Sequence, residues 1–241
     1  MKSLCHPLSV PRFEAFRALR YSPSFQLNDV SAPPYDVLSE PDRRVLCDRH
    51  PNNIAHIDVP VGGDAYQVAA DTLRNWIAGG VLEYDDVPSL TLYRMSFVDS
   101  VGKPRSTVGV IGALEVVDEG AGGVLPHERT TTKAKTDRLE LTRATDTNMS
   151  PVWGLSLANG LSAQLLAASE PRGSFVDTDG VTHSVERVSD PARIAEISAS
   201  ISAHQVVIAD GHHRYAVSRT FRDEVRQRTH RSDTDAELTL T

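Results

Sequence analysis

The residues best suited to chemistry lie in one short stretch, Val206–Tyr215 (VVIADGHHRY). Its apolar residues predict a short buried strand, and an Asp-Gly corner leads into a helix predicted from Tyr215 to about Arg226. A strand that turns sharply into a helix directs backbone N–H groups and the positive end of the helix dipole toward one point. Phosphate groups bind at such points, so the stretch predicts a phosphate site.

The side chains of this corner suit the same ligand. Gly211 allows the backbone to come close to a ligand, and His213 and Arg214 add charged donors. Arginine can bind a phosphate through two parallel hydrogen bonds. His212 and His213 are adjacent and point in different directions, so at most one is expected to contact the phosphate. Asp210 has two interpretations: it helps to hold Mg²⁺, or it caps the helix.

A second stretch, Leu125–Lys133 (LPHERTTTK), places His127 and Glu128 beside hydroxyls and cations. It is not a zinc-protease motif, because no second histidine lies four residues after His127. The stretch opens a local cluster of basic residues in an acidic protein, namely Arg129, Lys133, Lys135, Arg138 and Arg143. Two interpretations stay open for this cluster: a solvated helix face, or a second wall of an anion site.

A third stretch, Ser31–Asp36 (SAPPYD), contains two prolines and is therefore predicted to be extended. Such a loop can hold the phenol of Tyr35 and the carboxylate of Asp36 at the edge of a site. From the residues alone, a rigid connector is favoured.

Composition limits the function classes. The chain has 241 residues, of which 40% are hydrophobic and 24% charged, so an ordered core is expected. Its net charge of −7 argues against a general nucleic-acid binder. The two cysteines, Cys5 and Cys47, form neither a metal spacing nor a disulfide framework. No signal pattern and no membrane-length apolar run is present, so a soluble, cytoplasmic protein without a membrane partner is expected.

The remaining segments predict an α+β fold with mixed and antiparallel sheets and flanking helices. Helices are expected to begin after Ser39, Asp64 and Asp190. A strand is expected at 54–59, and antiparallel hairpins at 90–117 and 174–188. The expected organisation is one compact domain over 1–241. In it, 1–88 and 190–230 form a core, and 89–189 is a β-rich insertion.

Several stretches together resemble a large bacterial family of long-uncharacterised domains (DUF number 1015). They are FRALRY (16–21), APPYDV (32–37), PNNI (51–54), LPHERT (125–130), DRLELTRAT (137–145) and IADGHHRY (208–215). The resemblance runs from about Phe13 to Arg226. Members of that family usually extend further, so this chain is expected to be part of a longer protein.

The family resembles the ParB/sulfiredoxin fold, which includes free-serine kinases. This resemblance implies a ParB/sulfiredoxin-like core. Sulfiredoxins carry Gly-Cys-His-Arg at the corner. Gly211, His213 and Arg214 match that pattern, which favours His213 for the phosphate contact, but His212 replaces the nucleophilic cysteine. ParB proteins bind CTP at a related corner and add a basic helix-turn-helix, which is not found here. Phosphate binding by the corner is the property that remains compatible with both the sulfiredoxin and the ParB comparison.

The resemblance implies phosphoryl transfer to a small hydroxyl metabolite, with L-serine converted to O-phosphoserine. The donor is expected to be ATP, ADP or pyrophosphate, with Mg²⁺ held by Asp210. Glu128 or Asp36 is expected to accept the hydroxyl proton, with a slight preference for Glu128. The expected phosphate or nucleotide binders are Gly211, His212, His213, Arg214, His127, Arg138 and Arg143, and the expected substrate binders are Tyr35 and Thr130.

A different class of function stays open, a non-catalytic ParB-like nucleotide-binding regulatory domain. Such a domain needs phosphate binders but no carboxylate base. The kinase is preferred, because the His127–Glu128 pair and the Tyr35–Asp36 loop have no evident use in a simple switch. The sequence leaves open whether the protein forms a homodimer.

Overall fold

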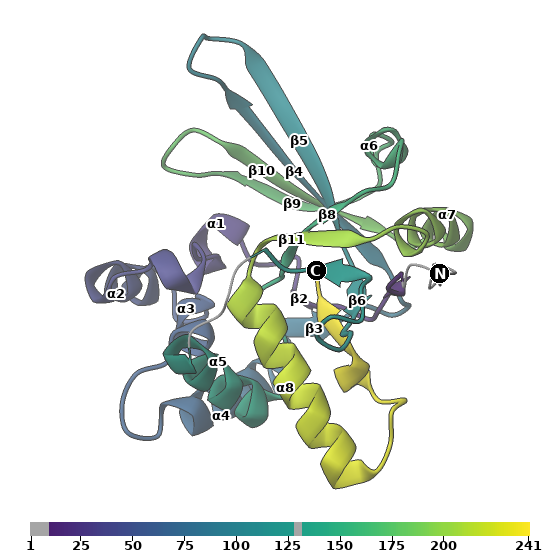
Figure 1. Ribbon diagram of the computed structural model, residues 1–241. Coiled ribbons are helices and arrows are strands. Elements are labelled where there is room, and N and C mark those ends of the chain that lie inside the picture. Colours follow the sequence, from purple (N-terminus) through teal and green to yellow (C-terminus); the bar gives the residue numbers. More distant parts are fainter. Residues whose placement is uncertain (1–9, 128–131) are drawn as a thin grey trace.

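Residues 10–127 and 132–241 are described by a computed structural model (Figure 1). It has the mixed α+β architecture that the sequence predicts, with antiparallel sheets and flanking helices. Among the described residues, no helix is both long and apolar enough to cross a membrane.

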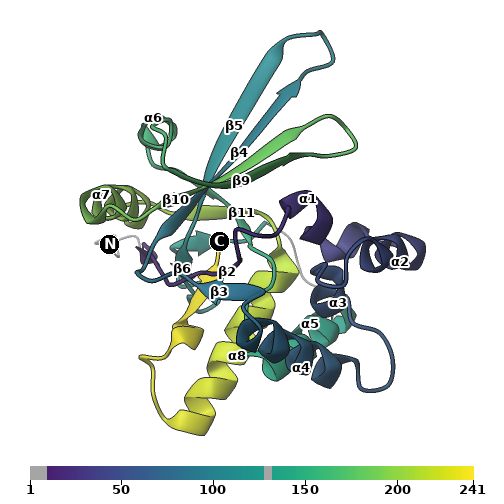
Figure 2. The same ribbon diagram turned by 180° about the vertical axis from the view of Figure 1, so that it is seen from behind.

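The largest sheet has four antiparallel strands in the order β5-β4-β10-β9 and projects from the rest of the molecule (Figures 1 and 2). It consists of two long hairpins, formed by β4 (Leu90–Val98) with β5 (Pro104–Ile111), and by β9 (Glu170–Val176) with β10 (Thr182–Val188). Both predicted hairpins are confirmed. The first ends earlier than predicted, because the chain leaves the large sheet at Gly112.

Gly112 marks the point where the chain passes from one sheet to another. A Cβ atom there would lie 2.3 Å from the ring of Phe13 and 2.9 Å from Leu90, so only glycine fits. The next strand, β6 (Ala113–Glu115), is the centre of a small antiparallel sheet. Its neighbours are β1 (Phe13–Glu14) and β12 (Leu238–Leu240), which come from the two ends of the described chain.

A third sheet carries the predicted corner. Its central strand, β11 (Val206–Asp210), pairs in parallel with β7 (Val124–Leu125) and antiparallel with β8 (Trp153–Ser156). The fourth sheet is a two-stranded ribbon of β2 (Leu19–Tyr21) and β3 (Leu82–Tyr84).

Helices cover the sheets on several sides. Helix α8 (His212–Thr229) packs against α5 (Thr132–Thr145), which packs against α4 (Ala65–Ala78). The other helices are α1 (Leu27–Val30), α2 (Glu40–Arg49), α3 (Ala55–Asp58), α6 (Leu161–Gln164) and α7 (Pro191–Ser202), with 3₁₀ turns at Tyr35–Val37 and Asp235–Glu237. Ser39 and Asp190 cap α2 and α7 as predicted, whereas Asp64 makes no side-chain cap.

Two hydrophobic clusters hold these elements together. The larger includes Leu92, Leu114, Ile197 and Ile208, and therefore draws on both the 89–189 segment and the segments that flank it. The smaller lies between α4, α3 and α5, around Trp76.

The predicted strand at 54–59 is wrong, because α3 occupies these residues. The cause is the buried side chain of Asn53. Its amide donates to the carbonyls of Asp29 (2.8 Å) and Ser31 (2.9 Å), and its oxygen accepts from the Ala55 N–H (3.0 Å). These long-range bonds fold the chain into a helical turn, which no local pattern of apolar residues could indicate.

A buried ionic network joins the two-stranded ribbon to the large sheet. The Asp85 carboxylate accepts two hydrogen bonds from Arg20, at 3.0 Å each, and one from Ser89 at 2.6 Å. Arg187 of β10 lies 3.8 Å away and also pairs with Asp86. Burial opposes ionisation of Asp85, but the hydrogen bonds from Arg20 and Ser89 outweigh it and hold the pKa of the carboxyl below its ordinary value.

We predict that Asp85→Asn lowers the free energy of unfolding by about 3–5 kcal/mol, because it leaves buried arginines without their anion. Since the folded pKa is lowered, the stability that Asp85 contributes is complete above the unfolded pKa. It is lost as the pH falls through the folded pKa. Urea denaturation at several pH values measures both effects.

The matched control is Asp86→Asn, because Asp86 is 78% exposed. It should cost less than about 1 kcal/mol. Equal losses in the two variants would show that burial of the Asp85 network does not matter.

Candidate functional site

The predicted strand-to-helix corner is present, and the helix starts three residues earlier than expected. Strand β11 ends at Asp210, Gly211 adopts a left-handed conformation (φ 87°), and α8 begins at His212. A Cβ atom on Gly211 would lie 3.1 Å from the Arg214 guanidinium and 3.2 Å from the backbone of Val152. Glycine therefore permits both the turn and the close packing around Arg214.

Arg214 is fixed by two bonds at this corner. Its guanidinium donates to the Asp210 carboxylate at 2.5 Å and to the carbonyl of Pro151. The N-cap residue of α8 is Gly211, which has no side chain to cap the helix, and the Asp210 carboxylate before it pairs with Arg214. The pair joins the end of β11 to the segment that enters β8.

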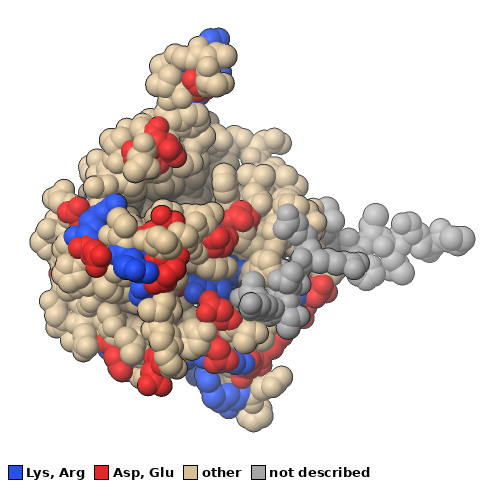
Figure 3. Space-filling model, turned by 90° about the vertical axis from the view of Figure 1, so that its left-hand side faces the viewer, with Lys and Arg blue, Asp and Glu red and all other residues tan. Residues whose placement is uncertain are grey.

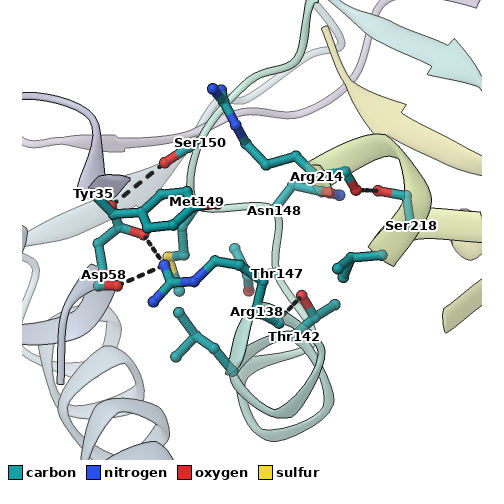
Figure 4. A pocket seen from close by; sticks show the side chains of 12 residues that line it. Tyr35, Asp58, Arg138, Thr142, Thr147, Asn148, Met149, Ser150, Arg214 and Ser218 are labelled. Carbon is teal, nitrogen blue, oxygen red and sulfur yellow. Dashed lines mark hydrogen bonds and ion pairs between the residues drawn. The ribbon is translucent and has the colours of Figure 1, made fainter. Parts of the chain in front are cut away.

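A small pocket of about 40 Å³ lies beside the corner (Figure 4). This space holds roughly three water molecules, or a group of similar size such as a phosphate. The 3₁₀ turn, α3, α5, the 147–150 segment and α8 contribute its walls. The polar lining residues are Tyr35, Asp58, Arg138, Thr142, Thr147, Asn148, Ser150, Arg214 and Ser218.

One side of the pocket is formed by an ion pair between two buried residues, Asp58 and Arg138. Arg138 donates to the Asp58 carboxylate at 3.0 Å and to the Asp58 carbonyl at 2.7 Å. Asp58 is 5% exposed. The guanidinium carbon of Arg138 also lies 4.1 Å from the centre of the Tyr35 ring, in a cation–π contact.

Burial raises the pKa of the Asp58 carboxyl above its ordinary value, although Arg138 and Ser150 oppose the shift. Burial likewise raises the pKa of Tyr35, against the charges of Arg138 and Arg214. A carboxylate with a raised pKa, facing the Ser150 hydroxyl at 3.4 Å, is a group that can accept a proton from a bound alcohol.

The structure brings together three of the predicted residues, Tyr35, Arg138 and Arg214, in this one pocket. Asp36 is exposed and does not line it. Arg143 lies on α5 but faces α8, where it pairs with Glu224. Glu128 and Thr130 lie outside the described residues.

The predicted histidines lie at the start of α8. The His127 N–H donates to the His212 ring at 3.3 Å, and the two rings meet edge to face with centres 4.4 Å apart. His212 is buried, whereas His213 is partly exposed.

Sequence reasoning missed Asp58, Asn148, Ser150 and Ser218. The apolar pattern around Asp58 predicts a strand, although an aspartate within an apolar run is a usable signal for a special role. Ser218 lies within the predicted helix from Tyr215 to about Arg226, where a single serine gives no signal for a site. Its hydroxyl lies 2.7 Å from that of Thr239, which in turn donates to Asn148 at 3.2 Å.

At the corner, a magnesium ion would find one suitable protein ligand, the carboxylate of Asp210. The described part of the chain has no group of three or more His, Cys, Asp or Glu side chains that could hold a metal. Magnesium often binds through one or two carboxylates together with substrate phosphates, and the exposed carboxylate of Asp210 suits that role. On the face shown in Figure 3, acidic and basic side chains are intermixed, and most of the upper surface carries neither.

We predict that Arg138→Met lowers the free energy of unfolding by about 3–5 kcal/mol, because it leaves Asp58 buried without its cation. Adding Asp58→Asn to this variant should recover part of the loss, so that the two changes are not additive in urea denaturation. Arg143→Met, on the same helix, serves as the control and should cost less than about 1 kcal/mol. Additive losses would contradict the assigned coupling.

Comparison with known proteins gives the family alone. No curated protein and no solved structure matches the chain. A family model described as "Protein of unknown function (DUF1015)" matches residues 13–241. This match includes the corner, the pocket and every described strand and helix. The chain therefore belongs to the DUF1015 family.

Proposed function

We propose that this chain transfers a phosphoryl group to the hydroxyl of a small metabolite. Free L-serine is the preferred acceptor, and a nucleotide or pyrophosphate is the donor. The observation that carries the proposal is the buried Asp58 carboxylate, which faces a small polar pocket beside the Asp210–Arg214 corner. Phosphoryl transfer depends mainly on positioning and charge neutralisation. In the proposal, Asp58 in the pocket positions the acceptor hydroxyl, and Arg214 at the corner neutralises charge on the donor phosphates.

Asp58 takes the place of Glu128 and Asp36 as the proposed base. Its raised pKa makes it a better proton acceptor than an ordinary carboxylate. In the proposed step, Asp58 accepts the proton of the acceptor hydroxyl, and the oxygen of that hydroxyl forms a bond to the transferred phosphorus. The bond from phosphorus to the leaving phosphate oxygen breaks. Arg138 orients Asp58 through its two hydrogen bonds.

The corner is the proposed site of the donor phosphates. Gly211 has no side chain to keep a phosphate away from the backbone. Arg214 supplies a guanidinium held by the Pro151 carbonyl, and His213, which is partly exposed, is the adjacent residue. When bound, Mg²⁺ neutralises charge on the donor phosphates, and Asp210 is its proposed protein ligand. Arg214 then exchanges its bond to Asp210 for a bond to phosphate.

The acceptor pocket supports a small polar substrate. Thr142, Thr147, Asn148 and Ser150 line it with hydroxyl and amide groups, and its volume excludes a whole nucleotide. The ParB/sulfiredoxin resemblance adds free serine as the acceptor and a ParB/sulfiredoxin-like core as the scaffold. A regulatory nucleotide-binding domain would use the corner but would need no base, so the buried Asp58 favours the kinase.

We predict that the protein forms O-phosphoserine from L-serine and Mg²⁺ with at least one of ATP, ADP and pyrophosphate. Asp58→Asn should lower turnover by about 10²–10⁴-fold, because the base is removed, and should retain donor affinity in calorimetry. Arg214→Ala should instead abolish donor binding. Activity of the unaltered protein should fall as the pH falls through the raised pKa of Asp58, because only the ionised carboxylate accepts a proton.

Asp36→Asn is the matched control for Asp58→Asn, because Asp36 is an exposed carboxylate next to the pocket residue Tyr35. It should leave turnover unchanged. Donor binding without product from any donor would support the regulatory domain instead. Unchanged donor affinity in both His213→Ala and Arg214→Ala would contradict the corner as the phosphate site.

A further inference from the structure

The two tryptophans of the chain lie in opposite environments. Trp76 on α4 is 6% exposed and belongs to the smaller hydrophobic cluster. Trp153, the first residue of β8, is 60% exposed. A large ring left in water gives up the stabilisation that burial would provide, so its position calls for an explanation outside the core.

Trp153 lies beside the corner. In the pairing of β8 with β11, its partner is Asp210, whose carboxylate holds Arg214. Directly opposed residues of antiparallel strands have Cα atoms roughly 4.5–5.5 Å apart. A register shift falls between Ile208 and Asp210, so Ala209 is an extra residue of β11 opposite the step from Gly154 to Trp153.

The same region is tied together by the backbone. Pro151, two residues before Trp153, accepts a hydrogen bond from Arg214. The position of Trp153 is therefore coupled to the guanidinium that is proposed to bind phosphate. Asp210 is thus both the strand partner of Trp153 and the ion-pair partner of Arg214.

We infer that Trp153 is a stacking platform for the base of a nucleotide whose phosphates bind at the Asp210–Arg214 corner. The inference rests on the proposed function and extends it, because it selects a nucleotide over pyrophosphate as the preferred donor. Aromatic side chains stack on any nucleobase through their faces, and this contact needs an exposed ring beside a phosphate site. Pyrophosphate has no ring and gains nothing from Trp153.

Leu155 and Leu157 extend the exposed apolar row along β8 and its end. Such a row is also compatible with self-association. The nucleotide is favoured because Trp153 is the member of the row that lies opposite Asp210, whereas Leu155 lies opposite Val207, further from the corner. Leu157 thus offers a matched control, exposed to a similar extent but more distant from Asp210.

The test compares ATP, ADP and pyrophosphate binding to the full chain by calorimetry, with Mg²⁺ present. Trp153→Ala should weaken ATP or ADP binding by about tenfold or more, the size expected for loss of one base stack, and leave pyrophosphate binding unchanged. Trp153→Phe should retain most of the nucleotide affinity. Leu157→Ala should change none of the three. Nucleotide binding should also quench the fluorescence of Trp153, and a Trp76→Phe variant should retain that quenching.

The outcomes distinguish failure of the stacking inference from failure of the proposed function. Pyrophosphate binding that Arg214→Ala abolishes, with nucleotide binding indifferent to Trp153→Ala, would overturn the stacking role and keep the phosphate site. No binding of any of the three donors would overturn both. Light scattering that shows self-association lost in Trp153→Ala, with nucleotide affinity unchanged, would identify the row as a self-interface and overturn the inference.

Discussion

The pairing of Asp58 with Arg138 is the interaction on which the candidate site depends. A carboxylate this deeply buried is stable only if a cation and hydrogen bonds compensate for the water it has lost. Arg138 provides the compensation from α5 and Asp58 receives it on α3, so the ion pair fixes the relative position of two helices. Tyr35, Ser150 and the start of α8 then close around the pair. The same interaction that allows the charge to be buried also joins the walls that α3 and α5 contribute to the pocket.

The corner was predictable because its signals are local. An apolar strand, an Asp-Gly turn and the residues after it dictate a sharp entry into a helix, and Gly211 has the positive φ that glycine favours. Even here the helix began earlier than predicted. His212 and His213 have only modest helix propensity, so tertiary packing, with His212 buried against His127, decides that boundary.

The pocket was less predictable because it is assembled from distant segments. The local pattern predicts a strand at Asp58, because the buried Asn53 that folds this segment into α3 acts through carbonyls more than 20 residues away. Arg138 and Arg143 looked equivalent in a cluster of basic residues. Five residues along a helix correspond to a rotation of about 140°. One guanidinium therefore reaches Asp58, while the other meets Glu224 on α8.

The passage of the chain through Gly112 has a consequence for the order of folding. Strand β6 pairs on one side with β1, where Phe13 meets Leu114, and on the other with β12, where Leu114 meets Thr239. Phe13 and Leu114 are 101 positions apart in the chain, and Leu114 and Thr239 are 125 apart. During synthesis, β1 must wait for β6, and β6 keeps an open edge until β12 has been made and has paired with it. Contacts of such long range slow folding, and an open edge strand invites pairing with another chain in the meantime.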